Sequence, residues 1–96
     1  MTKAELVSKI SDQLGIEKGD VLATVEAFMT EVKSSVASGN NVYLRGFGSF
    51  IVKTRAEKTG RNISKNTTLT IPAHNIPAFK PAKVFVQSVK NHVKVK

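Results

Sequence analysis

The apolar residues of this chain change their spacing at Gly39-Asn40. Before this point they recur every three or four residues, as on one face of a helix. After it, in NNVYLRGFGSFIVKTRAEK (residues 40–58), they follow the period of two that is typical of strands. Because 96 residues fit one domain, this change predicts a single α+β domain with helices first and strands second.

Two helices are predicted before the change. Thr2 suits the start of the first, because its hydroxyl can accept from a helical amide while Glu5 reaches back. Gly15 ends this helix, and the second runs from about Lys18 to Ser38. The apolar faces consist of Leu6, Val7, Ile10 and Leu14 in the first helix, and of Val21, Leu22, Val25, Phe28, Met29, Val32 and Val36 in the second.

The second half predicts a three-stranded antiparallel sheet followed by a last helix. Two strands meet at a tight turn at residues 46–48, and TTLTIPA (67–73) is the return strand. Pro72 has no amide to donate, so we expect it at an edge or a bulge. HNIPAFKP (74–81) is interpreted as an extended connector, and Pro81 as a helix start. The last apolar face is Ala82, Phe85, Val86, Val89 and Val93, although the final VKVK could equally be a strand.

Residues 53–73 are expected to protrude as a two-stranded ribbon arm with its tip at 59–66, because they carry few large apolar side chains. Residues 1–52 and 74–96 then form a body of roughly 65–70 residues, a size at which one core is weak. This body nevertheless presents three apolar helix faces as well as Phe47, Phe50 and Phe79. A core shared by two chains resolves the conflict, so we expect a twofold homodimer with two arms.

The charge is high and unevenly distributed. The net charge is +8, and residues 49–96 hold ten basic side chains and one acidic, whereas residues 1–48 hold five basic and six acidic. Such asymmetry indicates a polyanionic partner for the second half, and the alternative is a surface that is merely basic. The cations in question are Lys53, Arg55, Lys58, Arg61 and Lys65 on the arm, and Lys80 and Lys83 where the arm rejoins the body.

Helix stability does not explain two of the lysines. Lys83 and Lys3 are both expected in the first turn of a helix, where a cation opposes the helix dipole. Phosphate contact explains them better. Lysines such as Lys9 and Lys33 are instead interpreted as solvated surface charges.

The sequence offers no enzyme, metal or cofactor site. There is no cysteine, His74 and His92 have no ligand partners at useful spacing, and no nucleophile stands with a base. No run approaches the roughly 20 apolar residues of a membrane span, and the N-terminus lacks a signal core, so a cytosolic protein is expected.

RNA, an acidic membrane and an acidic polysaccharide are the competing polyanions. RNA recognition typically stacks bases on aromatic side chains, and the arm has none between Phe50 and Phe79. A membrane surface would bind a basic amphipathic helix with bulky anchors, and the last helix offers only Phe85 and a few lysines. RNA and a membrane surface are therefore the weaker candidates for the polyanionic partner.

Four motifs, in this order and at these spacings, resemble the HU/IHF family of bacterial histone-like, DNA-bending proteins. They are GFGSF (46–50), GRN (60–62), IPA (71–73) and PAFKPAK (77–83), and the resemblance covers essentially all 96 residues. It implies an intertwined homodimer whose two ribbon arms bend double-stranded DNA from the minor groove. It also implies a nucleoid protein of the cytoplasm that compacts DNA and prefers bent, nicked or cruciform duplexes. A related chain could replace one protomer in a heterodimer.

The resemblance assigns roles residue by residue. The DNA-binding residues would be Lys3, Gly46, Lys53, Arg55, Lys58, Arg61, Asn62, Ile63, Lys65, Asn66, Lys80 and Lys83. The dimer core would contain Phe28, Met29, Val32, Phe47, Phe50, Phe79 and Phe85. Two positions depart from the family pattern: Ala82 replaces a glycine, and Ile63 replaces the proline that wedges between base pairs. We expect Ile63 to act as the wedge.

Overall fold

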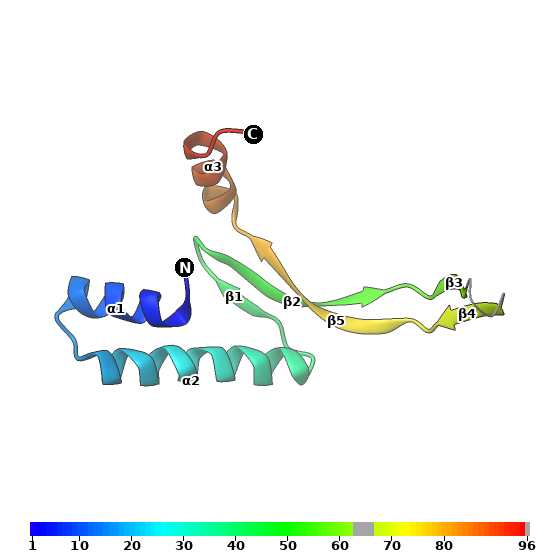
Figure 1. Cartoon of the computed structure of the whole chain (residues 1–96), viewed down its shortest axis with the longest axis horizontal. Helices are drawn as coiled ribbons and strands as arrows, with labels where there is room; N and C mark the ends of the chain where they lie inside the picture. The colour runs from blue at the N-terminus through cyan, green and yellow to red at the C-terminus, as the bar shows by residue number, and fades with distance from the viewer. Residues whose placement is uncertain (63–66, 96) are drawn as a thin grey trace. The chain divides into compact units, whose positions relative to one another are not determined.

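The computed structural model describes residues 1–62 and 67–95, with only the backbone given for 61, 62 and 67–69. The chain forms two compact units, Met1–Ser35 and Val36–Lys96. Figure 1 shows the predicted α+β order, which is confirmed. The elements are α1 (Lys3–Leu14), α2 (Lys18–Ala37), β1 (Val42–Leu44), β2 (Gly48–Arg55), β3 (Lys58–Asn62), β4 (Thr67–Ile71), β5 (His74–Pro81) and α3 (Lys83–His92).

The ends of α1 are capped as the sequence predicts. The Thr2 hydroxyl oxygen accepts from the Glu5 amide at 3.2 Å. The Glu5 carboxylate accepts the Thr2 hydroxyl at 3.4 Å instead of reaching the backbone. Gly15 adopts a left-handed φ of 68° and its amide donates to the Ser11 carbonyl at 2.9 Å, which ends the helix. Val7 of α1 and Val21 of α2 are buried.

The sheet has the order β1-β2-β5, with both pairs antiparallel. The Phe47 amide donates to the Leu44 carbonyl at 3.0 Å across the β1–β2 turn, where Gly46 has a φ of 79°. Pairing of β1 with β2 ends at Val42↔Phe50. One step further, the Asn41 side-chain oxygen accepts from the Val52 amide at 3.0 Å, in place of a third strand. Beyond this point β2 pairs with β5 alone.

The prediction that residues 74–81 form a connector is wrong, because this segment is β5 and pairs with β2 along its whole length. The bond from the Val52 amide to Asn41 shows that this amide points away from β5. Its partner Pro77 therefore stands where no mutual hydrogen bond is made, and its missing amide costs nothing. Pro81 lies four residues further along β5, so its backbone nitrogen also points away from β2. It is the last residue of β5, and α3 begins at Lys83, so the predicted helix start at Pro81 is wrong.

The strands β3 and β4 continue the register of β2 and β5. Arg55↔His74 is the last pair of the first ladder and Lys58↔Ile71 the first pair of the second, with two residues between them on each strand. No residue is bulged out. Pro72 lies in this gap. It is an odd number of residues from Pro77, so its backbone nitrogen points toward the partner strand, where an amide would have been needed for pairing. Pro72 therefore marks a break in the ladder and not a bulge.

Four phenylalanines from β2, β5, the β1–β2 turn and α3 form an aromatic cluster. Ring centroids are 5.3 Å apart for Phe47–Phe79, 4.9 Å for Phe50–Phe79 and 5.5 Å for Phe47–Phe85. Gly48 lies beneath this cluster, and a Cβ there would come within 2.6 Å of the Phe79 ring and of the Lys80 carbonyl oxygen. The end of α3 at His92 corrects the expectation for Val93, which follows the helix with extended backbone.

Candidate nucleic-acid interface

The alternation of side chains gives the β2–β5 strand pair two chemically different faces. The pairs Phe50↔Phe79 and Val52↔Pro77 place these four side chains on one side, which we call the aromatic face. The other side, which we call the cationic face, carries Ser49, Ile51, Lys53 and Arg55 from β2 and His74, Ile76, Ala78 and Lys80 from β5.

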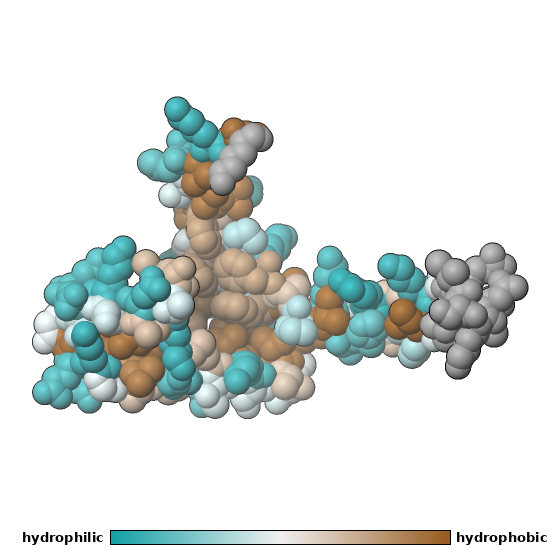
Figure 2. Space-filling model, in the orientation of Figure 1, coloured by the Kyte–Doolittle hydropathy of each residue, from teal (hydrophilic) through white to brown (hydrophobic). Residues whose placement is uncertain are grey.

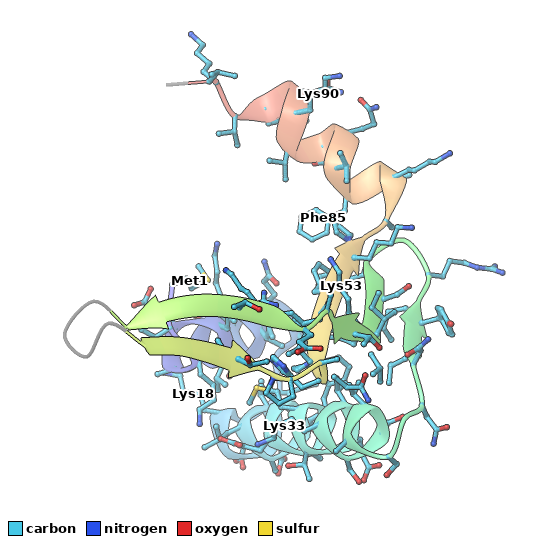
Figure 3. The ribbon with its side chains drawn as sticks, turned by 90° about the vertical axis from the view of Figure 1, so that its right-hand side faces the viewer. Met1, Lys18, Lys33, Lys53, Phe85 and Lys90 are labelled. Carbon is cyan, nitrogen blue, oxygen red and sulfur yellow. The ribbon has the colours of Figure 1, made fainter. Side chains whose placement is uncertain are left out.

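The cations lie at both ends of the cationic face. Lys53 and Arg55 are two residues apart on β2, which separates their Cα atoms by about 6.6 Å along the strand. Lys80 lies at the other end, opposite Ser49, and Tyr43 of β1 completes that row. The three cations are exposed, and Figure 3 marks Lys53. Within residues 1–62 and 67–95 none of them has an ion-pair partner.

His74 stands opposite Arg55 at the end of the strand pair. Its ring Nδ1 lies 3.1 Å from the Pro72 carbonyl oxygen. Because a carbonyl oxygen can only accept, Nδ1 is the donor and carries the proton. A further partner of the ring can then be bound only through its other nitrogen, Nε2, on the face that also carries Lys53 and Arg55.

The remaining arm residues fall partly within the described structure. Lys58 is exposed and pairs with Ile71, in the opposite phase to Arg55. The backbone of Arg61 and Asn62 is part of β3, opposite Thr68 and Thr67. The predicted site residues Ile63, Lys65 and Asn66 lie outside the described residues.

The two lysines expected at helix starts have different surroundings. Lys83 is the first residue of α3, where Ala82 has no side chain that could cap the helix and the first turn contains no acid. Lys3 is the first residue of α1 and forms an ion pair with Glu26 of α2. The sequence analysis missed this partner, which gives Lys3 a structural role besides any contact with phosphate.

The two glycines of the β1–β2 turn also differ. Gly46 is exposed, and a Cβ there would meet nothing within 4 Å, so its backbone is accessible. Its positive φ of 79° favours glycine at this position. Gly48 is buried against Phe79 and serves packing.

The residues assigned to a dimer core differ in exposure. Phe28 and Met29 on α2 keep 46% and 37% of their surface exposed, and Val32 is half-buried. In the aromatic cluster Phe47 and Phe79 remain 45% and 39% exposed, while Phe50 and Phe85 are half-buried. Among the side chains that the structure describes, Val7 and Val21 are the only buried hydrophobic ones.

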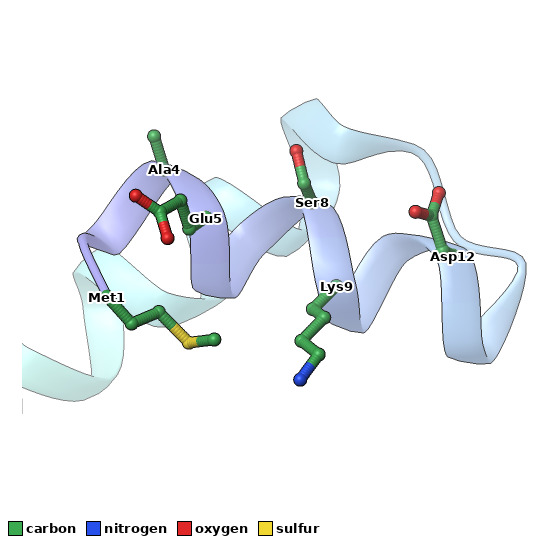
Figure 4. A pocket seen from close by; sticks show the side chains of 6 residues that line it. All are labelled: Met1, Ala4, Glu5, Ser8, Lys9 and Asp12. Atoms are coloured by element: carbon green, nitrogen blue, oxygen red, sulfur yellow. The ribbon is translucent and has the colours of Figure 1, made fainter.

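Other kinds of site find little support. No group of three or more metal-ligating side chains occurs in the described part of the chain. A hollow of about 430 Å³ runs along α1, lined by Met1, Ala4, Glu5, Ser8, Lys9 and Asp12 (Figure 4). Its lining comes from a single helix and the residue before it, so no groups converge there from different elements. None of the described helices is long and apolar enough to cross a membrane.

Comparison with known proteins agrees with this geometry. The sequence profile of the family described as bacterial DNA-binding protein matches residues 1–90. The DNA-binding protein HU of Thermus thermophilus is 40% identical over 90 residues, which cover 94% of this chain and 93% of that protein. HU from an Anabaena HU–DNA cocrystal structure is 36% identical with a TM-score of 0.87, covering 93% of this chain and 97% of that one.

A more distant structure shares the fold. HU from Thermotoga maritima is 25% identical with a TM-score of 0.66, and the match covers 93% of this chain and 98% of that one. The profile match includes α1, α2, all five strands and α3 as far as residue 90. The chain therefore belongs to the bacterial DNA-binding protein family, the family of the HU proteins.

Proposed function

We propose that this chain binds and bends double-stranded DNA without sequence specificity, as an architectural protein of the bacterial nucleoid in the cytoplasm. The cationic face is the observation that carries the proposal. Lys53, Arg55 and Lys80 are exposed and have no ion-pair partner in the described residues, on the same strands whose other face holds the aromatic cluster. The function is binding and not catalysis.

Phosphate contact supplies most of the affinity. The contacting residues are proposed to be Lys3, Gly46, Lys53, Arg55, Lys58, Arg61, Asn62, Lys65, Asn66, Lys80 and Lys83. If roughly 6–10 phosphates are neutralised by a dimer, the slope of log affinity against log salt concentration is about −5 to −9. For Lys3, the contact competes with its ion pair to Glu26. A modest preference for A·T pairs is compatible with the minor groove, which distinguishes mainly A·T from G·C.

The tip is proposed to enter the minor groove with Ile63 as its wedge. Ile63 follows directly after β3 in the sequence, between the cations Arg61 and Lys65. An apolar side chain between two phosphate-binding residues can enter an opened base step, and isoleucine is among the known wedges. Unstacking costs a few kcal/mol per step, which additional contacts along the bent duplex offset. The preference for bent, nicked and cruciform duplexes follows, because these need less unstacking.

A second copy of the chain is proposed to cover the exposed apolar surface. Phe47 and Phe79 of the aromatic cluster and the valines of α3 are too exposed for a stable core in one chain. Self-association of residues 1–52 and 74–96 buries them and leaves residues 53–73 as the DNA-binding arm. A related chain with the same apolar face could take the place of one protomer.

Titration with salt tests the proposed function. Affinity for a duplex is measured by fluorescence anisotropy over a range of salt concentrations, with single-stranded RNA and acidic vesicles as competitors. The expected results are the steep slope given above and poor competition by RNA and vesicles. A slope near −1, or stronger binding to either competitor, contradicts the proposal.

A further inference from the structure

The last helix carries a row of cations that the sequence analysis did not connect. Lys83 and Lys90 are seven residues apart, which returns to nearly the same side of an α-helix. Gln87 lies between them, and all three side chains are exposed. No acidic residue follows Glu57 in the whole sequence, so nothing on α3 offsets these charges.

Packing within the second unit determines where this row points. The Phe85 ring stacks on Phe47 at 5.5 Å and meets Phe79 edge-on at 6.5 Å, which fixes this side of α3 against the sheet. At about 100° per residue, Lys83 and Lys90 are roughly 140–160° around the helix from Phe85. They therefore point away from the aromatic cluster. Hydrophilic and hydrophobic residues occupy different sides of α3 in Figure 2, and Figure 3 marks both Phe85 and Lys90.

The apolar side of α3 is centred near Phe85 and Val89, away from Lys83 and Gln87. Val89 is 48% exposed and lies about 40° around the helix from Phe85, on the same side, whereas Val86, 45% exposed, lies about 100° from Phe85, at the border with Lys90. In the homodimer proposed above, a second copy covers these valines. The row formed by Lys83, Gln87 and Lys90 then remains at the surface.

Helix stability accounts for only one end of the row. Lys90 is in the last turn of α3, where a cation is favoured by the helix dipole. Lys83 is in the first turn, where a cation is disfavoured. An extended anion along this side of the helix accounts for both lysines.

We propose that Gln87 and Lys90 extend the phosphate-binding row that begins at Lys80 and Lys83, so that α3 contacts duplex DNA flanking the segment held by the arm. Lys83 and Lys90 are separated by about 10 Å along the helix axis, the rise of about three base pairs. Because Gln87 carries no charge, Lys90 alone adds one neutralised phosphate per protomer. This inference rests on the proposed DNA binding and deepens it by lengthening the bound site.

The test compares Lys90→Gln with Lys33→Gln, which removes the same charge from an exposed position on α2. Salt slopes are measured on a long duplex and on the shortest duplex that the wild type still binds. For Lys90→Gln the slope should become shallower by up to about 1.8 on the long duplex, from about 0.9 for each of two protomers, and stay unchanged on the short one. Lys33→Gln should change neither slope, and Lys90→Arg should restore the wild-type slope.

Two outcomes overturn the inference. In one, Lys90→Gln has the wild-type slope on the long duplex. In the other, it lowers the slope equally on both duplexes, which indicates a general charge effect. Lys53→Gln separates this inference from the proposed function. If Lys53→Gln weakens binding and Lys90→Gln does not, only the contact by α3 is wrong, and if the wild type fails to bind duplex DNA, the proposed function itself is wrong. Circular dichroism verifies that each variant is folded.

Discussion

The aromatic face and the cationic face of the β2–β5 strand pair differ in what their side chains contact. On the aromatic face, Phe50 and Phe79 contact each other, and Phe79 also contacts Phe47. On the cationic face, Lys53 and Arg55 have no ion-pair partner in the part of the chain that the structure describes. One ribbon thus combines side chains that pack together with exposed cations that have no ion-pair partner in the described residues, and substitutions on the two faces should affect different properties.

The largest expected effect is on the aromatic face. Phe79→Ala removes the ring that joins β5 to the turn and to α3, and should lower the free energy of unfolding by about 3 kcal/mol. Urea denaturation measures the loss. The salt slope of the fraction that remains folded should stay as in the wild type. A loss below about 1 kcal/mol would mean that the cluster does not support the fold.

The exposed part of the aromatic cluster predicts a dimer whose stability depends on concentration. Each tenfold increase in protein concentration should stabilise the folded dimer by about 1.4 kcal/mol, because association favours the native state. Thermal unfolding over a hundredfold concentration range measures this shift, with sedimentation giving the mass. A constant midpoint together with a monomer mass would rule out the shared core.

Substitutions on the cationic face should weaken DNA binding and leave the stability of the fold almost unchanged. Lys53→Gln should change the free energy of unfolding by less than about 0.5 kcal/mol, because the side chain is exposed and unpaired. The salt slope on duplex DNA should become shallower by up to about 1.8 for the two protomers. Lys9→Gln on α1 is the matched control and should leave the slope unchanged. Equal effects of the two substitutions would show that only net charge matters.

The tip tests whether a residue of neither face controls the shape of the DNA. Ile63→Ala should reduce bending and the preference for nicked DNA, while the salt slope changes little because no charge is lost. Ile63→Pro should keep or increase bending. End-to-end distances of bound duplexes, measured by fluorescence energy transfer, distinguish the variants. Identical distances for the wild type and Ile63→Ala would reduce Ile63 to a tolerated turn residue.

The helices and the first two strands could be predicted from the sequence because their signals are local. The caps at Thr2 and Gly15 involve neighbours at most four residues away. The strand β5 was not predicted because a proline costs a strand a hydrogen bond only where its backbone nitrogen faces the partner strand. Pro77 is harmless opposite Val52, and nothing in the sequence near Pro77 reveals this pairing.

The candidate site shows the same limit. The alternation of Lys53 and Arg55 could be predicted, and so could the position of Lys83 at a helix start. The ion pair between Lys3 and Glu26 joins residues 23 positions apart on two helices, so it required the packed structure. The row that links Lys83 to Lys90 had a local signal, their spacing of seven residues, which the interpretation of single lysines overlooked.

The single register that runs through both ladders restricts how a ribbon of this kind can change its length in evolution. Losing one residue from one strand shifts every partner beyond it to the opposite face. Losing one residue from each strand keeps the partners but still turns the outer part of the ribbon over relative to the sheet. Only a loss or gain of two residues in each strand keeps both the pairing partners and the face on which each side chain lies. Each such step changes the reach of the ribbon by about 6.6 Å, close to two base pairs of duplex. Ribbons that keep the same two faces should therefore differ in length by whole steps of this size.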